Sequence, residues 1–218
     1  MEESTWILQP GASLQSLLDE PTCPPPLRRA LASTYSWQAR NETTVGRTLE
    51  ASRLAPQFVA ALLALGASVT VGGEDGRRQV PLEVSVKRQV QGEVGELRVP
   101  CLAPGYRWGE ARVARAPSDE PIVAAYAVVG MRDGIVQSAR VALTGVSSGP
   151  VRLVDAPEAL VGGPLTEAGI RRVAASVEEE VEPDGNYKGS RVYRRAMAGV
   201  LTRRALQACL EQEVGDAE

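Results

Sequence analysis

The apolar positions in the first third of the chain recur at the spacing of amphipathic helices. After Pro24, Pro25 and Pro26, apolar side chains return every three or four residues up to about Trp37, and proline suits the first turn of a helix. A second apolar stripe comprises Leu54, Phe58, Ala61, Leu62 and Leu65. Gly66 stops this stripe as a left-handed cap would. The pattern predicts helices over residues 24–37 and 54–65, the second with a buried face.

Shorter patterns complete the first half of the chain. Residues 5–9 are typical of a strand, and Ser13 can cap a short helix that ends before Pro21. Residues 68–71 and 78–82 are predicted strands, joined by a glycine-rich turn. The periodicity then weakens between Lys87 and Gly109, and we place a domain boundary after residue 100.

The second half has a strand-rich part followed by two helical patterns. Residues 122–129 and 135–143 are rich in valine and alanine and flank the turn Met131-Arg132-Asp133-Gly134, which predicts an antiparallel pair. Residues 111–114 supply a third strand, and helices are expected over 166–182 and 190–212. The sequence therefore predicts an α+β chain of two domains, 1–100 and 101–218. The second domain is expected to hold a three-stranded antiparallel sheet with helices.

Composition excludes several classes of function. The net charge of −3 and the pI near 5.3 give no electrostatic reason to expect a nucleic-acid partner. No run approaches the ~20 apolar residues of a membrane span, and the acidic start is unlike a signal peptide. We expect a cytoplasmic protein without a membrane partner.

The residues that usually carry catalysis are scarce. Histidine is absent, which removes histidine-based triads and the commonest metal ligand. Cys23, Cys101 and Cys209 lie far apart, so neither disulfides nor a metal site is indicated. The run Glu178-Glu179-Glu180 is interpreted as a solvated helix face. The sequence predicts no catalytic residue and no metal ligand in this chain.

Several segments together resemble a known family. The first combines Arg40-Asn41 with Thr44-Val45-Gly46-Arg47-Thr48, and residues 58–67 follow as a helix that ends in Ala-Leu-Leu-Ala-Leu-Gly-Ala. Further matches are residues 112–119, 121–125, 139–143, 150–152, 189–195 and 200–204. In this order they resemble the flavin-carrying medium subunit of molybdenum hydroxylases, the carbon monoxide and xanthine dehydrogenase group.

The resemblance implies a fold and a function. Residues 1–100 are similar to the second lobe of an FAD-binding domain, and residues 101–218 to the C-terminal domain of the same subunits. The first lobe of such subunits has no counterpart in this chain. The gene lacks it, another chain supplies it, or the start codon is misplaced.

The resemblance also implies candidate cofactor contacts. In the family, a turn Thr-(Ile/Val)-Gly-Gly-Asn brings backbone N–H groups to FAD phosphate, and Thr44, Gly46 and Thr48 fall on this turn. Arg47 stands where the family has its second glycine. Its side chain either obstructs the approach of the cofactor or reaches a phosphate oxygen itself. Gln57 falls where the family often has an aspartate near the flavin hydroxyls, and Arg112 falls where it commonly has lysine.

Two functions follow from the resemblance. The first is an oxidoreductase subunit that transfers electrons through FAD, with an iron–sulfur subunit and a molybdopterin subunit as partners and with the site completed by a partner. The second is an FAD-free structural or assembly subunit of such a complex. FAD binding by the isolated chain is doubtful, because the first lobe and the second glycine are both missing.

Overall fold

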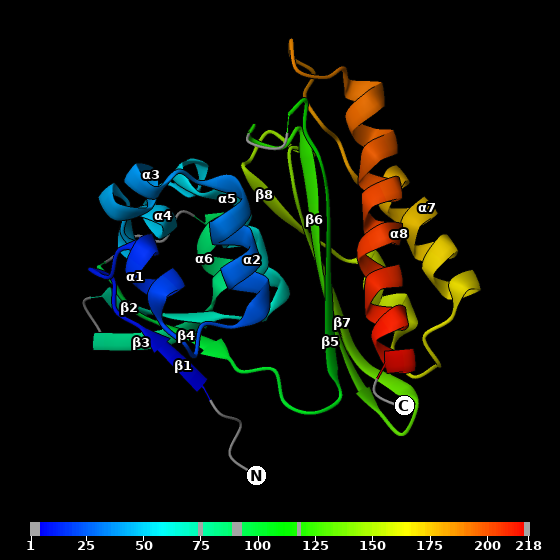
Figure 1. The fold of residues 1–218 in the computed structure, drawn as a ribbon, viewed down its shortest axis with the longest axis horizontal. Coiled ribbons are helices and arrows are strands. Elements are labelled where there is room, and N and C mark those ends of the chain that lie inside the picture. Colours follow the sequence, from blue (N-terminus) through cyan, green and yellow to red (C-terminus); the bar gives the residue numbers. More distant parts are fainter. Residues whose placement is uncertain (1–4, 74–75, 89–92, 117–118, 216–218) are drawn as a thin grey trace. The chain divides into compact units, whose positions relative to one another are not determined.

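A computed structural model describes residues 5–73, 76–88, 93–116 and 119–215. The chain divides into two compact units, residues 1–103 and 104–218 (Figure 1). Both units combine helices with antiparallel strands, which confirms the predicted α+β class. Each unit is described by itself.

The first unit is built on an antiparallel sheet with the strand order β1-β4-β2-β3. These strands are β1 (Thr5–Leu8), β2 (Ser68–Gly73), β3 (Gly76–Pro81) and β4 (Val94–Pro100). The helices of this unit lie together over one face of the sheet (Figure 1). They are α1 (Leu14–Asp19), α2 (Pro25–Thr34), α3 (Trp37–Glu42), α4 (Val45–Glu50), α5 (Pro56–Ala64) and α6 (Leu82–Arg88).

Helix α5 forms the centre of the first unit, because every one of its residues is buried. Leu62 and Phe58 have no exposed surface, and Gly66 ends the helical segment at φ +73°, as predicted. The apolar stripe of this helix was predicted to begin at Leu54, which is too early. Leu54 belongs to the separate short turn η1 (Ser52–Leu54) and is 44% exposed, because Pro56 begins the helix and leaves Leu54 outside it.

Three short elements in the first unit depart from the predicted pattern. Helix α2 ends at Thr34 rather than near Trp37, because Ser36 caps a new helix, α3, by accepting the N–H of Ala39. Helix α6 begins at Leu82, which was predicted to lie in a strand. Strand β4 lies in the region where no element was predicted. Part of the predicted turn between β2 and β3 lies outside the described residues.

The second unit is built on an antiparallel sheet with the order β5-β6-β7-β8. Its strands are β5 (Tyr106–Val113), β6 (Val123–Arg132), β7 (Ile135–Thr144) and β8 (Val151–Val154). The prediction of three strands was therefore wrong. Strand β8 has four residues, too few to show a period of two, yet it pairs with β7 from Val141↔Val154 to Thr144↔Val151.

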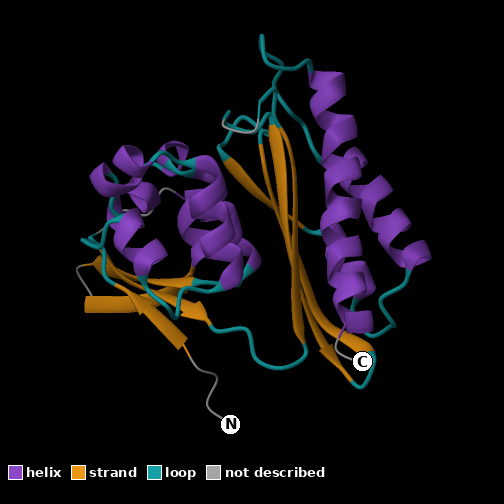
Figure 2. Cartoon of the chain, in the orientation of Figure 1, coloured by secondary structure: helices purple, strands orange, loops and turns teal. Residues whose placement is uncertain are grey.

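Helices cover one face of this second sheet (Figure 2). They are the short η2 (Ala156–Leu160), α7 (Glu167–Glu180) and α8 (Arg191–Gly215). Val123, Ala125, Ala127 and Val129 point from β6 into the core that these helices close. The turn from β6 to β7 has Asp133 at φ +52° and Gly134 at φ +75°, the left-handed pair that its Asp-Gly sequence predicts.

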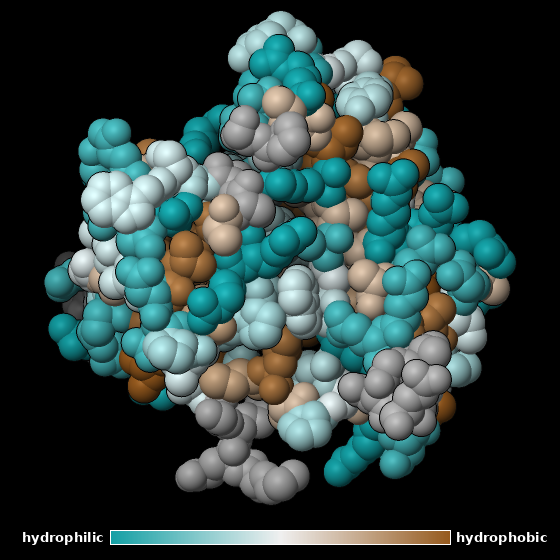
Figure 3. All heavy atoms as spheres, viewed as in Figure 1, coloured by the Kyte–Doolittle hydropathy of each residue, from teal (hydrophilic) through white to brown (hydrophobic). Residues whose placement is uncertain are grey.

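The surface is mixed in character. On the face drawn in Figure 3, hydrophilic side chains predominate and the apolar ones form small separate groups. None of the described helices combines the length and the apolar character that crossing a membrane requires.

Candidate functional site

The turn that the resemblance singles out is the first turn of α4. Thr44 is the cap of this helix, and its Oγ1 accepts the N–H of Arg47 at 3.4 Å. Gly46 and Thr48 lie inside the helix and are buried, whereas the side chain of Arg47 is exposed. Thr44, Gly46 and Thr48 thus lie at the cap and in the first turn of a six-residue helix.

Backbone N–H groups of this turn already have acceptors within the chain. The N–H of Val45 donates to the carbonyl oxygen of Ala12 at 2.9 Å, and the N–H of Gly46 donates to that of Pro10 at 2.8 Å. The N–H of Thr48 donates to the carbonyl oxygen of Thr44 at 3.1 Å. The loop between β1 and α1 therefore occupies the donors that a diphosphate would need.

Gly46 allows close packing at this point. A Cβ atom at Gly46 would lie 3.2 Å from the carbonyl oxygen of Pro10 and 3.3 Å from its Cβ. The close approach that glycine permits here is made by the β1–α1 loop of the same chain. The side-chain hydroxyl of Thr48 also has a partner within the chain, since its Oγ1 donates to the carbonyl oxygen of Val45 at 2.7 Å.

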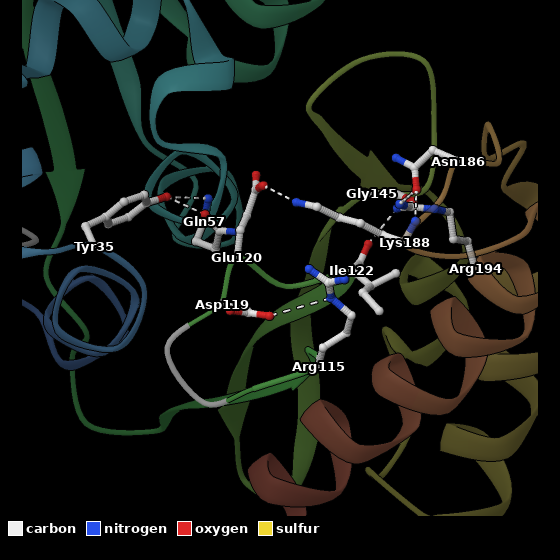
Figure 4. A network of polar contacts seen from close by, with 10 residues as sticks. All are labelled: Tyr35, Gln57, Arg115, Asp119, Glu120, Ile122, Gly145, Asn186, Lys188 and Arg194. Atoms are coloured by element: carbon white, nitrogen blue, oxygen red, sulfur yellow. Dashed lines mark hydrogen bonds and ion pairs between the residues drawn. The ribbon is translucent and has the colours of Figure 1, made fainter.

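Gln57 lies at the start of α5 and is 1% exposed. Its side-chain Oε1 accepts the hydroxyl proton of Tyr35, and its backbone N–H donates to the same hydroxyl at 3.1 Å. Figure 4 shows the two side chains directed toward each other. The acceptor that Gln57 would offer to a cofactor hydroxyl is therefore occupied by Tyr35.

Arg40, from the Arg-Asn pair before the turn, holds the first three helices together. Its Nε donates to Oε1 of Gln15 at 2.7 Å, and its Nη1 donates to the carbonyl oxygens of Leu31 and Tyr35. Sequence reasoning used this pair only as a signature and missed its structural role. The signal was present, since an arginine beside a short helix end is able to satisfy several carbonyl groups.

Arg112 belongs to the second unit, unlike the other four candidates. It lies on β5, opposite Ala124 of β6, and is half-buried. Its neighbours Ala111 and Val113 pack against the core. Because side chains alternate along a strand, Arg112 lies on the face of the sheet turned away from α7 and α8.

A second arginine of the family-like segments proves to be structural. Arg194 is 6% exposed, and Nη1 of its guanidinium donates to the carbonyl oxygens of Ile122 at 2.7 Å and Gly145 at 2.9 Å. Its Nη2 donates to Oδ1 of Asn186 at 2.9 Å (Figure 4). The tail motif around Tyr193-Arg194 therefore ties the start of β6 and the end of β7 to the loop before α8.

Titratable groups give no sign of a catalytic centre among the described residues. Burial raises the pKa of the Cys209 thiol to about 12 and that of the Cys23 thiol to about 11, so both are protonated at neutral pH. No group of three His, Cys, Asp or Glu side chains gathers in the described part of the chain. Glu180 is less solvated than predicted, because its carboxylate accepts from Arg152 and from the N–H groups of Asp155 and Ala156.

Comparison with known proteins shows which proteins the chain resembles. Residues 111–209 match the model of the CO dehydrogenase flavoprotein C-terminal domain. The chain is 28% identical to the carbon monoxide dehydrogenase medium chain of Hydrogenophaga pseudoflava, over 78% of this chain and 62% of that protein. It is 24% identical to the glyceraldehyde dehydrogenase medium chain of Sulfolobus acidocaldarius, over 84% of this chain and 67% of that protein.

Solved structures agree with these relatives. A chain of carbon monoxide dehydrogenase from Hydrogenophaga pseudoflava matches with a TM-score of 0.85 and 26% identity, covering 97% of this chain and 77% of that one. Quinoline 2-oxidoreductase from Pseudomonas putida 86 shares the fold, with a TM-score of 0.77 and 24% identity. The chain thus has the fold of flavoprotein-type dehydrogenase subunits. In sequence it is similar to carbon monoxide dehydrogenase medium chains, and it spans about two thirds of the length of these curated relatives.

Proposed function

We propose that this chain is the medium, flavoprotein-type subunit of a molybdenum hydroxylase or xanthine dehydrogenase-like oxidoreductase complex. The observation that carries the proposal is the match of 97% of the chain, through both units, to a carbon monoxide dehydrogenase chain at a TM-score of 0.85. On this proposal, residues 1–100 are the second lobe of an FAD-binding domain, and residues 101–218 are the C-terminal domain of the subunit.

The cofactor in this proposal is FAD, which when bound would supply the redox chemistry. The candidate contacts are Thr44, Gly46, Thr48, Gln57 and Arg112. The first unit does not fit a diphosphate through the backbone of its α4 turn, because the N–H groups of Val45 and Gly46 donate to the β1–α1 loop. We expect a partner to complete the site, while this chain contributes side chains and docking surface.

The partners follow from the same proposal. An iron–sulfur subunit and a molybdopterin subunit would supply the electron path and the substrate site. The relatives include a subunit of the 6-hydroxypseudooxynicotine dehydrogenase complex of Paenarthrobacter nicotinovorans, 29% identical over 86% of this chain. We expect the complex to be cytoplasmic.

Co-expression of this chain with candidate iron–sulfur and molybdopterin subunits from the same organism tests the proposal. We expect a complex that co-purifies through a tag on this chain and shows flavin absorbance with a stoichiometry near one FAD per chain. A colourless complex that still contains the molybdenum-enzyme subunits would support an FAD-free structural subunit instead. Failure of any such subunit to co-purify would contradict both functions.

A further inference from the structure

We propose that Gln212 shields the outer edge of β5 from strand addition by a second copy of this chain. The inference concerns the second unit alone and does not depend on the proposed function. It rests on two hydrogen bonds that join the side chain of Gln212 to the backbone of Trp108.

Strand β5 lies at one end of its sheet. In the described part of the chain, the order β5-β6-β7-β8 gives it β6 as its partner strand. It has eight residues, whereas β8, at the opposite end of the sheet, has four. An edge strand presents a row of backbone N–H and C=O groups to which another chain can add. Of the two ends of this sheet, β5 is therefore the longer template for an added strand.

Alternate residues of β5 direct their backbone groups toward β6 or away from it. The carbonyl oxygen of Gly105 accepts the N–H of Met131 at 2.8 Å. At the other end of the strand, the carbonyl oxygen of Val113 accepts the N–H of Ile122 at 2.8 Å. Because the bonds to one neighbour recur at every second residue of a strand, odd-numbered positions bond to β6. The backbone groups of Trp108, at an even-numbered position, therefore point to the outer edge.

The side-chain amide of Gln212 binds these outward groups. Its Nε2 donates to the carbonyl oxygen of Trp108 at 2.7 Å, and its Oε1 accepts the N–H of Trp108 at 3.2 Å. In an antiparallel sheet, two opposed residues exchange the same pair of bonds. Because a glutamine side chain carries the donor and the acceptor of a peptide group, Gln212 takes the place of one residue of an added strand.

The packing of α8 on β5 sets the position of Gln212. A Cβ atom at Gly109 would lie 2.1 Å from the carbonyl oxygen of Ala205 and 2.9 Å from the Cβ of Ala208, so glycine lets the helix approach the strand. Gln212 lies one helical turn beyond Ala208, on the same face of α8. Cys209, on this face, has no exposed surface, whereas Gln212 is exposed and binds the strand at its edge.

The charges on β5 favour a second copy of the same strand as the occupant. Glu110 and Arg112 have the outward register of Trp108, because they follow it at intervals of two along the strand. In an antiparallel pair of β5 strands related by a twofold axis at Ala111, Glu110 of each copy would lie opposite Arg112 of the other. Opposite charges at directly opposed positions stabilise the pairing of two strands.

The same register explains how Gln212 prevents this pairing. With the axis at Ala111, Ala114 of the second copy would lie opposite Trp108 and would bond to its N–H and C=O groups. These are the groups that Gln212 already binds. The second strand can therefore pair along β5 only after the side chain of Gln212 has left.

The experiment measures the association of the full chain by sedimentation equilibrium over a range of concentrations. The variants are Gln212→Ala and Gln212→Asn, and the second keeps the amide on a side chain that is shorter by one methylene. Gln207→Ala is the control, because Gln207 also lies on α8 but donates to the carboxylate of Glu167. We expect both Gln212 variants to dimerise with a dissociation constant at least about tenfold lower than that of the wild type and of Gln207→Ala.

Two further measurements locate the pairing on β5. Amide hydrogen exchange at Trp108, followed by NMR, should be faster in dilute Gln212→Ala than in the wild type, because the acceptor of this N–H is gone. Protection should return as the concentration rises and dimers form. Adding Glu110→Arg to Gln212→Ala should restore the wild-type state of association, because two pairs of like charges would then oppose each other.

Three results would overturn the inference. The first is association of both Gln212 variants at the wild-type level, with unchanged exchange at Trp108. The second is equal association of Gln207→Ala, since the cause would then be a general loosening of α8. The third is association of Gln212→Ala that persists after Glu110→Arg is added, which would assign it to a surface other than β5.

Discussion

The hydroxyl of Tyr35 binds Gln57 twice, accepting its backbone N–H at 3.1 Å and donating to its side-chain Oε1. These two hydrogen bonds hold the start of α5 to the end of α2 within the first unit. Because one hydroxyl serves both groups, its loss leaves a buried N–H and a buried amide oxygen without partners.

Tyr35→Phe is therefore expected to destabilise the first unit by about 1 to 3 kcal/mol, the usual cost of an unsatisfied buried polar group. Urea unfolding followed by tryptophan fluorescence measures the change. Tyr187→Phe is the matched control, since Tyr187 is 83% exposed. An equal, small effect of both variants would show that the Tyr35–Gln57 pair contributes little.

Leu62→Ala should cost the first unit about 2 to 5 kcal/mol, because a side chain with no exposed surface is removed from α5 and a cavity remains. Leu54→Ala, at a position 44% exposed, should cost much less. Thermal unfolding of both variants provides the comparison, and the second unit should be little affected by either. A melting temperature of Leu62→Ala within error of the wild type would contradict the buried stripe.

Arg194→Met should destabilise the second unit by about 2 to 5 kcal/mol. The carbonyl oxygens of Ile122 and Gly145 and the Oδ1 of Asn186 would lose a charged donor, and two of these lie at strand ends of the sheet. The adjacent Arg195→Met is the control, because that side chain is exposed. If denaturant midpoints of the two variants coincide, the network around Arg194 does not stabilise the fold.

The Cys209 thiol should lower the free energy of unfolding of the second unit as the pH becomes alkaline. Burial raises its pKa from 9.0 to about 12 in the folded chain, so the unfolded chain releases the proton first. The stabilising contribution is complete below pH 9 and is lost between pH 9 and pH 12, by about 1.4 kcal/mol for each unit of pH. Unfolding free energies measured at pH 8 and pH 10 should show a decline that Cys209→Ala lacks. An identical decline in the variant would assign it to other groups.

The sequence predicts the elements whose apolar period is sustained. Helix α7 and the β6–β7 hairpin fall where the pattern places them, because each repeats its period several times. Helices α3 and α4 have six residues each, fewer than two turns, so no period can be recognised. They depend instead on their caps, Ser36 and Thr44, and on tertiary packing.

For the candidate site, the sequence locates the turn but not the partners of its atoms. Thr44, Gly46 and Thr48 lie on one short helix and its cap, yet the acceptors of the N–H groups of Val45 and Gly46 come from Ala12 and Pro10, in a distant part of the sequence. Tyr35 was likewise not connected with Gln57. Spacing along the chain identifies residues that share an element, whereas hydrogen bonds between elements depend on the tertiary fold.

The contact between Gly46 and Pro10 gives this glycine a role in the fold that does not involve a ligand. A Cβ atom at position 46 would lie 3.2 Å from the carbonyl oxygen of Pro10, so glycine lets the β1–α1 loop pack directly on α4. The glycine at position 46 is therefore no evidence of flavin binding by this chain.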